Sequence, residues 1–315
     1  MEKLSPVIKR KSIDLSTKFY RFKKNYLNSL YMLPVILGII IFTIIPMGLA
    51  LVYSFCEMDL LDPYWELSSP SFEFYKIAFT SRFDEMSKAY FVTFRQVLVV
   101  NVISLIGSYV IALILNQKIK GMGAFKIIYY LPCLLPGLAS SLLWTGLTSE
   151  TGFFNQVLIT LGFNPYTWYY SNDTAFKTIL ILSGFGFSGN MIMWLAQLKN
   201  IPNDLYEEAK LSGASKIKQL FNITIPMSTS MVFYLIIMSI IGTLQSLSYY
   251  TQFIESEKTV TELKYVGTLI YEVAYVEYKI SYACALSWIL FAVIGVFTIL
   301  VFTTSRKWVY YAEDN

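Results

Sequence analysis

Six long apolar stretches constrain the fold of this 315-residue chain more than any other feature of its sequence. Each has about the 20 residues that a helix needs to cross the ~30 Å hydrocarbon core of a bilayer. Five of them contain no charged side chain, and the sixth has only Arg95 near its start, where a long side chain reaches the interface. The pattern predicts an all-α, polytopic membrane protein with six transmembrane helices, at roughly residues 31–55, 91–115, 127–147, 178–198, 227–250 and 282–304.

The composition favours lipid as the solvent and argues against chemistry within the chain. Hydrophobic residues make up 55% of the sequence and charged residues 15%, against about 25% charged in soluble domains. Histidine, the commonest general base and metal ligand, is absent, and the three cysteines are far apart. The net charge of +4 is too small and too clustered to indicate a nucleic-acid partner. We therefore expect no catalytic residue, no metal and no cofactor bound by this chain.

The distribution of charge predicts how the chain lies in the membrane. Of its 25 Lys and Arg residues, 17 fall in the N-terminal tail and in segments 118–126, 199–218 and 306–307, whereas 14 of the 21 acidic residues fall in the alternate segments. Positive charge stays on the cytoplasmic side. We therefore expect a multi-pass protein of the cell membrane with both termini cytoplasmic and a first span that is not cleaved. The aromatic-rich segments 56–90, 148–177 and 251–281 are then external.

The sequence contains no source of energy for transport. No G-x-x-x-x-G-K-[ST] phosphate-binding loop is present, and the spans lack the ionisable residues that ion-coupled carriers place at mid-membrane. If the protein transports a solute, another polypeptide must drive it from the cytoplasmic face.

The cytoplasmic segment YEEAKLSGASKIKQLFNITIP, residues 206–226, is a candidate contact for that polypeptide. Asn203 or Asp204 can cap a helix over 205–212, and Gly213 is suited to end it in a left-handed conformation. A second helix starting near 214–215 places Ile217, Leu220 and Phe221 on one face. The predicted elbow with an apolar stripe fits a groove of a partner. The alternative is an amphipathic loop lying on lipid headgroups.

The same segment resembles the EAA loop of the permease subunits of bacterial ABC importers. It matches E-A-A-x-x-x-G-A and I-x-x-P of the pattern E-A-A-x-x-x-G-A…F-x-x-I-x-x-P, with Phe221 two residues before Ile223. Glu208 replaces a small residue and Ser212 replaces an acidic one. The resemblance implies a coupling helix seated in a cleft of a cytoplasmic ATPase dimer, which uses ATP and Mg. The implied coupling residues are Glu207, Glu208, Ala209, Gly213, Ala214, Phe221 and Pro226.

From about residue 27 to 304 the chain is similar to the carbohydrate-uptake branch of that family, the MalF- and UgpA-type permeases. YMLPVILGIIIFTIIPMGLALVYSF (31–55) and YYLPCLLPGLASSLLW (129–144) carry the similarity, whereas Val92-Thr93 replaces a frequent Asn-Thr. The resemblance implies the type I importer (MetI-like) permease fold. The expected division is a basic tail (1–26), an extra first helix (27–56), an external segment (57–90), a five-helix core (91–304) including the coupling loop (200–226), and a cytoplasmic tail (305–315).

A polar face on the fifth span is a candidate path for a solute. Ser239, Thr243 and Ser246 recur at helical spacing beside Gly242, and an unpaired polar group in hydrocarbon costs several kcal/mol. The alternative is that such small residues only mediate helix packing. Resemblance to the maltose-type permease implies solute contacts at Leu182, Phe185, Gly186, Gly189, Ser239, Gly242, Thr243 and Ser246.

The resemblance thus implies one permease half of an ATP-driven, binding-protein-dependent importer for a sugar or oligosaccharide. The implied partners are a second permease forming a heterodimer, the ATPase dimer, an external solute-binding protein and membrane lipid. Three alternatives remain: a permease for another polar solute such as a glycerol phosphate, an integral-membrane enzyme, and an ion-coupled carrier. The near absence of cationic residues in the spans argues against an anionic solute.

Overall fold

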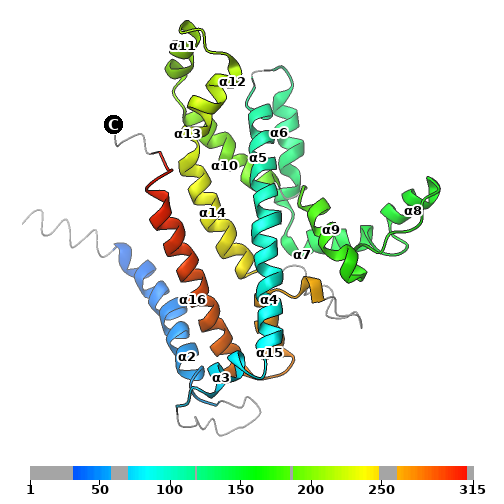
Figure 1. Ribbon diagram of the computed structural model, residues 1–315, viewed down its shortest axis with the longest axis vertical. Coiled ribbons are helices and arrows are strands. Elements are labelled where there is room, and N and C mark those ends of the chain that lie inside the picture. The colour runs from blue at the N-terminus through cyan, green and yellow to red at the C-terminus, as the bar shows by residue number, and fades with distance from the viewer. Residues whose placement is uncertain (1–30, 58–69, 118, 185–186, 248–260, 311–315) are drawn as a thin grey trace, which may run out of the picture.

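The structure is a computed structural model that describes residues 31–57, 70–117, 119–184, 187–247 and 261–310. Every regular element within these ranges is a helix, as the apolar stretches predict. Long helices lie side by side, with α11 and α12 projecting at one end, and α3 and the α15–α16 turn lying at the other (Figure 1). The described C-terminal residues lie toward the α11 end (Figure 1).

Three continuous helices among the described residues are long and apolar enough to cross a membrane. They are Tyr31–Tyr53, Phe83–Leu115 and Ile280–Ser305, in which an 18-residue stretch has a mean hydropathy of 2.8, 2.5 and 2.6, respectively. The first contains η1 (Ile40–Ile44) and α2 (Ile45–Tyr53), the second contains α4 (Phe83–Arg95), η2 (Gln96–Asn101) and α5 (Val102–Leu115), and the third is α16. The second begins eight residues before the expected boundary at 91, so α4 extends the span into the expected external segment.

Two bent helix pairs in the described chain are further candidate spans. Met122–Leu134 and Ala139–Leu147 meet at 98° and comprise α6 (Met122–Tyr130), η3 (Leu131–Leu134) and α7 (Gly137–Leu147). Proline explains this break, because the residue before a proline is driven out of the helical region, and Leu135 before Pro136 has φ −73 and ψ 130. Lys216–Met227 and Thr229–Leu244 meet at 56°. They comprise α12 (Lys216–Gln219), η6 (Leu220–Thr224), α13 (Ile225–Met227) and α14 (Thr229–Leu244).

The predicted span at 178–198 is not continuous in the described chain. It is divided between α9 (Asn172–Ser183) and α10 (Phe187–Asn200), and each piece alone is shorter than a membrane crossing. The described residues therefore contain three spans, or five if each bent pair counts as one, rather than a confirmed set of six. Residues 185 and 186, which connect the two pieces, lie outside the described residues.

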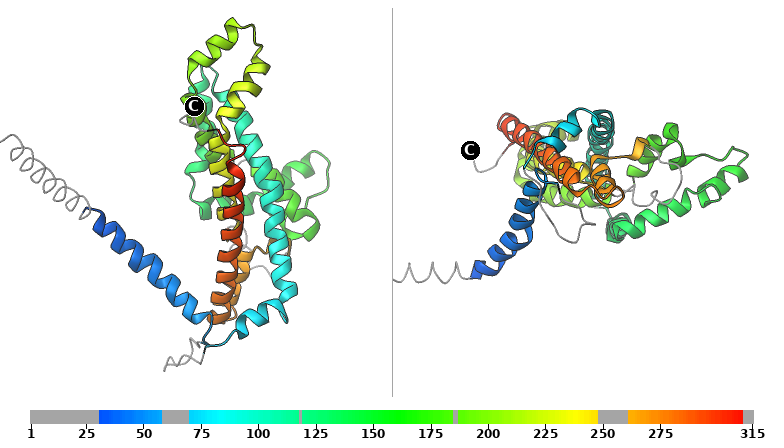
Figure 2. Two further views of the ribbon diagram at one scale, coloured as in Figure 1. Left: turned by 60° about the vertical axis from the view of Figure 1, so that its left-hand side comes forward. Right: turned by 90° about the horizontal axis from the view of Figure 1, so that it is seen from below.

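Two apolar cores hold most of the long helices together. α5 packs against α10, where Trp194 contacts Tyr109 edge-on at 4.7 Å between ring centroids. α4, α15 (Val266–Tyr275), α16 and α3 (Glu73–Phe79) enclose a second core around Leu244, Val273 and Leu286. By contrast α2 contains no buried residue and diverges from the bundle beyond its contact with α16 (Figure 2). α8 (Phe153–Thr160) also extends away from the long helices (Figure 1).

Candidate functional site

The predicted elbow is present and is built around Gly213. α11 (Asn203–Leu211) ends with Gly213 at φ +77, a left-handed conformation that glycine adopts without a Cβ clash. The Gly213 amide donates to the Lys210 carbonyl at 3.0 Å, and the Ala214 amide donates to the Ala209 carbonyl at 2.9 Å. This pair of bonds is the Schellman arrangement that satisfies the last carbonyls of a helix.

Further contacts fix the second arm of the elbow. Ser215 caps α12 by accepting from the Lys218 amide at 3.3 Å, close to the predicted start of this helix. Tyr206 on α11 shares a 2.9 Å hydrogen bond with Thr224 on η6. The predicted cap of the first arm is wrong: Pro202 occupies the N-cap position, so Asn203 and Asp204 lie in the first turn. Proline has no backbone N–H to donate, so it cannot continue the preceding helix α10.

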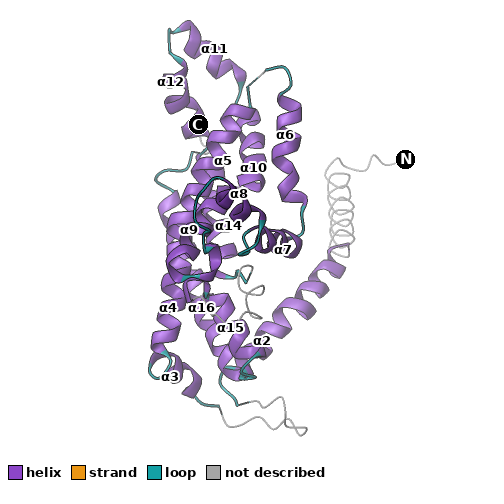
Figure 3. Ribbon diagram, turned by 90° about the vertical axis from the view of Figure 1, so that its right-hand side faces the viewer, coloured by secondary structure: helices purple, strands orange, loops and turns teal. Residues whose placement is uncertain are grey.

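The elbow exposes its apolar side chains. Leu211, Ile217 and Phe221 are 90%, 70% and 62% exposed. Of the other predicted coupling residues, Glu207 and Glu208 are exposed, whereas Ala209, Ala214 and Pro226 are half-buried. The two arms lie beyond the ends of α5, α6 and α10 (Figure 3). Exposed apolar side chains on a projecting end form a surface suited to a protein partner.

The predicted solute residues lie on three helices. Ser239, Gly242 and Thr243 lie on α14, with Ser246 just beyond its end, and none of the four is fully buried. Leu182, on α9, is buried in a cluster with Val100, Ile179 and Leu263. Gly189 lies on α10, and a Cβ added there would be 3.7 Å from Cys133 Sγ. Phe185 and Gly186 lie outside the described residues.

One polar residue at this place was not among the predicted contacts. Asn101, the last residue of η2, donates from Nδ2 to Thr243 Oγ1 at 2.8 Å and to the Ser239 carbonyl at 3.3 Å. The structure therefore joins the predicted polar face of α14 to the second span. An amide in the middle of an otherwise apolar stretch, VLVVNVISL, is the sequence signal that identifies it.

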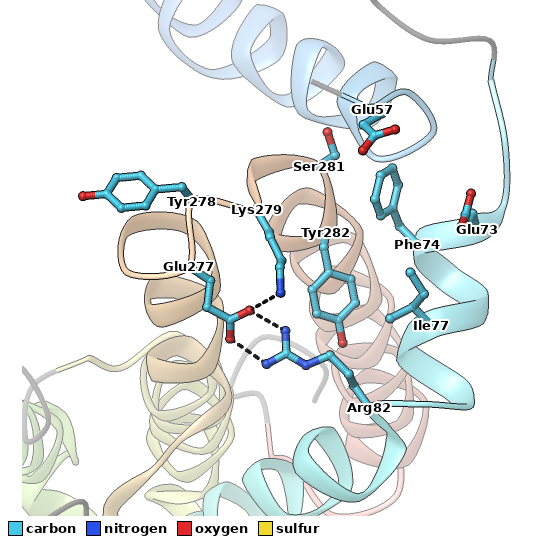
Figure 4. A pocket seen from close by; sticks show the side chains of 10 residues that line it. All are labelled: Glu57, Glu73, Phe74, Ile77, Arg82, Glu277, Tyr278, Lys279, Ser281 and Tyr282. Carbon is cyan, nitrogen blue, oxygen red and sulfur yellow. Dashed lines mark hydrogen bonds and ion pairs between the residues drawn. The ribbon is translucent and has the colours of Figure 1, made fainter. Parts of the chain in front are cut away.

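An ion cluster lies at the end opposite the elbow, beside a cavity of about 460 Å³ (Figure 4). Arg82 donates to both carboxylate oxygens of Glu277 at 2.8 and 2.6 Å, and Lys279 donates to Glu277 at 2.9 Å. The Arg82 guanidinium also lies 5.2 Å from the ring centroid of Tyr282. The hydrogen bond from Arg82 lowers the pKa of Glu277 to about 2, and the same bond raises the pKa of Arg82.

Arg95, the charged residue of the predicted second span, is also paired. It forms an ion pair with Glu262 of η7 (Thr261–Leu263) and lies 4.0 Å from the ring centroid of Phe176 on α9. Asn172 supports the same short helix, because its Oδ1 accepts from Thr261 Oγ1 at 3.2 Å. In the described part of the chain, no group of three or more Cys, Asp or Glu side chains could hold a metal ion.

Comparison with known proteins identifies the family. The chain is 31% identical over 301 residues to the probable ABC transporter permease protein YesP of Bacillus subtilis (strain 168), covering 93% of this chain and 94% of that protein. It is 29% identical over 204 residues to the lactose transport system permease protein LacF of Rhizobium radiobacter, covering 62% of this chain and 67% of that protein. None of the protein-family profiles compared with the chain matches it.

A solved structure shares the fold. A chain in the crystal structure of a bacterial alginate ABC transporter, in complex with alginate pentasaccharide-bound periplasmic protein, superposes with a TM-score of 0.78 at 20% identity. The match covers 92% of this chain and 97% of that chain. With the membrane-spanning helices and the near full-length similarity to YesP, this protein belongs to the ABC transporter permease family, the membrane-embedded subunits of these transporters.

Proposed function

We propose that this permease carries a sugar or oligosaccharide into the cell as one half of a binding-protein-dependent importer. The observation that carries the proposal is the elbow at Gly213, whose apolar side chains are exposed at one end of the helix bundle. Sugar as the solute is supported by LacF, whose name assigns it to lactose transport, and by the polar face on α14. The neighbouring solved structure concerns alginate, an acidic glycan, so the panel of solutes includes one.

The elbow is the coupling element in this proposal. Leu211, Ile217 and Phe221 would each contribute about 1.5–3 kcal/mol if a partner covered them completely. The partner is a cytoplasmic ATPase dimer that hydrolyses ATP with Mg, because this chain has no phosphate-binding loop. Glu207 and Glu208 flank the apolar surface and add charge-assisted contacts. Both termini and the elbow lie in the cytoplasm, where the excess of Lys and Arg places them.

The proposed importer requires two further partners. A second permease forms a heterodimer with this chain and completes the path, and an external binding protein delivers the solute. We retain the division into segments 1–26, 27–56, 57–90, 91–304 and 305–315. Movement of the elbow, transmitted through the bend at Ser228 into α14, switches the path between the two faces. A glycerol-phosphate-like solute is the alternative, and the solute panel distinguishes it.

The test uses the assembled importer in liposomes. The double variant Ile217→Asp/Phe221→Asp places charge on the knob, and Lys218→Gln on the same helix is the matched control. We expect the double variant to lose both co-purification of the ATPase and ATP-driven uptake of lactose, maltose or an alginate trisaccharide, while the control retains both. Unchanged uptake by the double variant contradicts the coupling role. Uptake of glycerol phosphate but of none of the glycans contradicts the sugar assignment.

A further inference from the structure

The π-helical segment η2 lies between the two parts of the predicted solute path. It packs against α14, which carries Ser239 and Thr243, and against α9, which carries Leu182. Val100 of η2 is buried in the same cluster as Leu182. π-helical turns are rare and occur frequently at functional sites. The presence of polar side chains on η2 therefore requires a functional explanation.

The hydrogen bonds of Asn101 fix the orientation of its amide. A backbone carbonyl oxygen can only accept, so the contact with the Ser239 carbonyl requires the NH₂ group of Asn101 to face α14. The same group donates to Thr243 Oγ1. The amide oxygen, Oδ1, consequently points away from these two partners. It makes no hydrogen bond with the described residues, and the side chain is only half-buried.

Thr243 offers the complementary group. Its oxygen accepts from Asn101, and its hydroxyl proton has no acceptor among the described residues. The neighbouring Gly242 is exposed, and a Cβ built on it would meet nothing within 4 Å. One unused acceptor and one unused donor thus lie on a hydrogen-bonded pair with open space beside it. A sugar hydroxyl, which both donates and accepts, fits such a pair.

A second interhelical hydrogen bond, made by the same long helix with α10, serves only to pack the two helices and provides a comparison. Ser108 on α5 accepts from Trp194 Nε1 at 3.1 Å and donates to the Leu105 carbonyl at 2.9 Å. Ser108 is fully buried, and both its donor and its acceptor are used. The Asn101–Thr243 pair differs on both points. It is partly accessible, and Asn101 Oδ1 and the Thr243 hydroxyl proton have no hydrogen-bond partner among the described residues.

The π-helical geometry adds Gln96 to the same side of the helix. In an α-helix, residues five apart are about 140° apart around the axis, whereas the π-helix hydrogen-bonds residue i to i+5 and brings them to the same side. Gln96 is 8% exposed, and its Oε1 has no hydrogen-bond partner among the described residues. A buried amide oxygen without a partner is costly. Its position one π-turn from Asn101 is consistent with a polar strip along η2.

We propose that Asn101 is a specificity-determining residue that reads one sugar hydroxyl together with Thr243, its Oδ1 accepting from the hydroxyl and the Thr243 hydroxyl donating to it. The inference rests on the proposed function as a sugar importer and extends it from α14 to the second span. Gln96 extends the same polar strip.

The experiment compares Asn101→Ala and Thr243→Val with Ser108→Ala, the matched control that removes a packing hydrogen bond from the same helix. Each assembled importer is reconstituted with its binding protein, and ATP-driven uptake is measured for lactose, cellobiose, maltose and an alginate trisaccharide. Lactose and cellobiose differ in the orientation of a single hydroxyl. Assembly is checked by size-exclusion chromatography. If Asn101→Ala fails to assemble, Asn101→Ser and Thr243→Val are read on the same panel.

For the glycan that the wild type carries best, we expect Asn101→Ala and Thr243→Val each to reduce uptake about tenfold or more, the effect of one lost hydrogen bond that leaves a polar partner unpaired. The rank order of the glycans should change. The double variant should lose no more than either single variant, because both groups read the same hydroxyl. Ser108→Ala should lower uptake of every glycan by a common factor.

An equal loss for all glycans in the Asn101 and Thr243 variants, or no loss at all, overturns the inference and leaves Asn101 as a packing residue. A wild-type importer that carries none of the four glycans contradicts the proposed function itself, so the two failures are distinguishable.

Discussion

Arg82 and Glu277 lie 195 residues apart in the sequence and form a bidentate ion pair, with N–O distances of 2.8 and 2.6 Å. The pair joins the residue before α4 to the turn between α15 and α16. The two side chains are 23% and 25% exposed, so water screens the pair only in part. It lies at the end of the helix bundle opposite the elbow, where α3 and the α15–α16 turn are found (Figure 1).

Glu277→Gln should therefore destabilise the protein. The substitution removes the charge and one of the two acceptors facing the guanidinium, and charge-assisted hydrogen bonds contribute about 1.5–3 kcal/mol each. We expect a loss of about 1–3 kcal/mol, measured by thermal unfolding in detergent. Glu73→Gln, on the rim of the same cavity but exposed, should cost about 0.5 kcal/mol or less. Equal unfolding temperatures for the two variants would show that the pair does not stabilise the fold.

The pair also predicts a pH dependence with a defined sign. The side-chain hydrogen bond from Arg82 lowers the pKa of Glu277 from 4.5 to about 2. Since the folded-state pKa is the lower one, the stabilisation is complete above about pH 4.5 and is lost as the pH falls toward about 2. The stability difference between wild type and Glu277→Gln should be constant from about pH 8 to about pH 5 and shrink below that. A difference that shrinks between pH 8 and 6 would contradict this assignment.

Gly213→Ala should separate transport from stability. Gly213 has φ +77 and Gly162, in the segment after α8, has φ +84, and a Cβ at either would meet no other atom within 4 Å. Both alanine variants should lose about 1 kcal/mol through backbone strain alone. Only Gly213→Ala should lower ATP-driven uptake several-fold, because it turns α12 away from its position relative to α11. Equal ATP-driven uptake by the two variants would show that the elbow does not couple ATP hydrolysis to transport.

The contact between Arg95 and Glu262 predicts a partial rescue. Glu262→Ala leaves the guanidinium without its carboxylate and should cost about 1–3 kcal/mol. The reversed pair Arg95→Glu/Glu262→Arg should recover part of this loss but not all of it, because the guanidinium no longer lies over Phe176. Thermal unfolding of Arg95→Glu, of Glu262→Arg and of the double variant measures the coupling. Strictly additive losses would exclude a direct interaction.

Local sequence predicted the elements that depend on nearest neighbours. Tyr31–Tyr53 and Ile280–Ser305 are helices because each is a long apolar run in which helical hydrogen bonds satisfy the backbone internally. Gly213 ends α11 in a left-handed turn because a residue without Cβ adopts it at little cost. Ile217 and Phe221 lie on the same face of the second arm because they are four residues apart.

Other features could not be predicted from the order of residues. Pro136 explains the break between η3 and α7, but the angle of 98° depends on how α6 and α7 pack. The stretch at 178–198 has the composition of one span, and its described residues are helical in α9 and α10. Asn101 gave no local sign of its partner, because Thr243 lies 142 residues further along the chain.

By itself, the sequence determined that this chain has helices for a membrane, which of its segments is a glycine-centred elbow, and that its energy must come from another polypeptide. Each of these follows from composition or from interactions within a few residues. Only the tertiary structure decided which polar and charged groups meet: Asn101 with Thr243, Arg95 with Glu262, and Arg82 with Glu277. In a low-dielectric interior each such group needs a partner, and helix packing rather than sequence proximity supplies it.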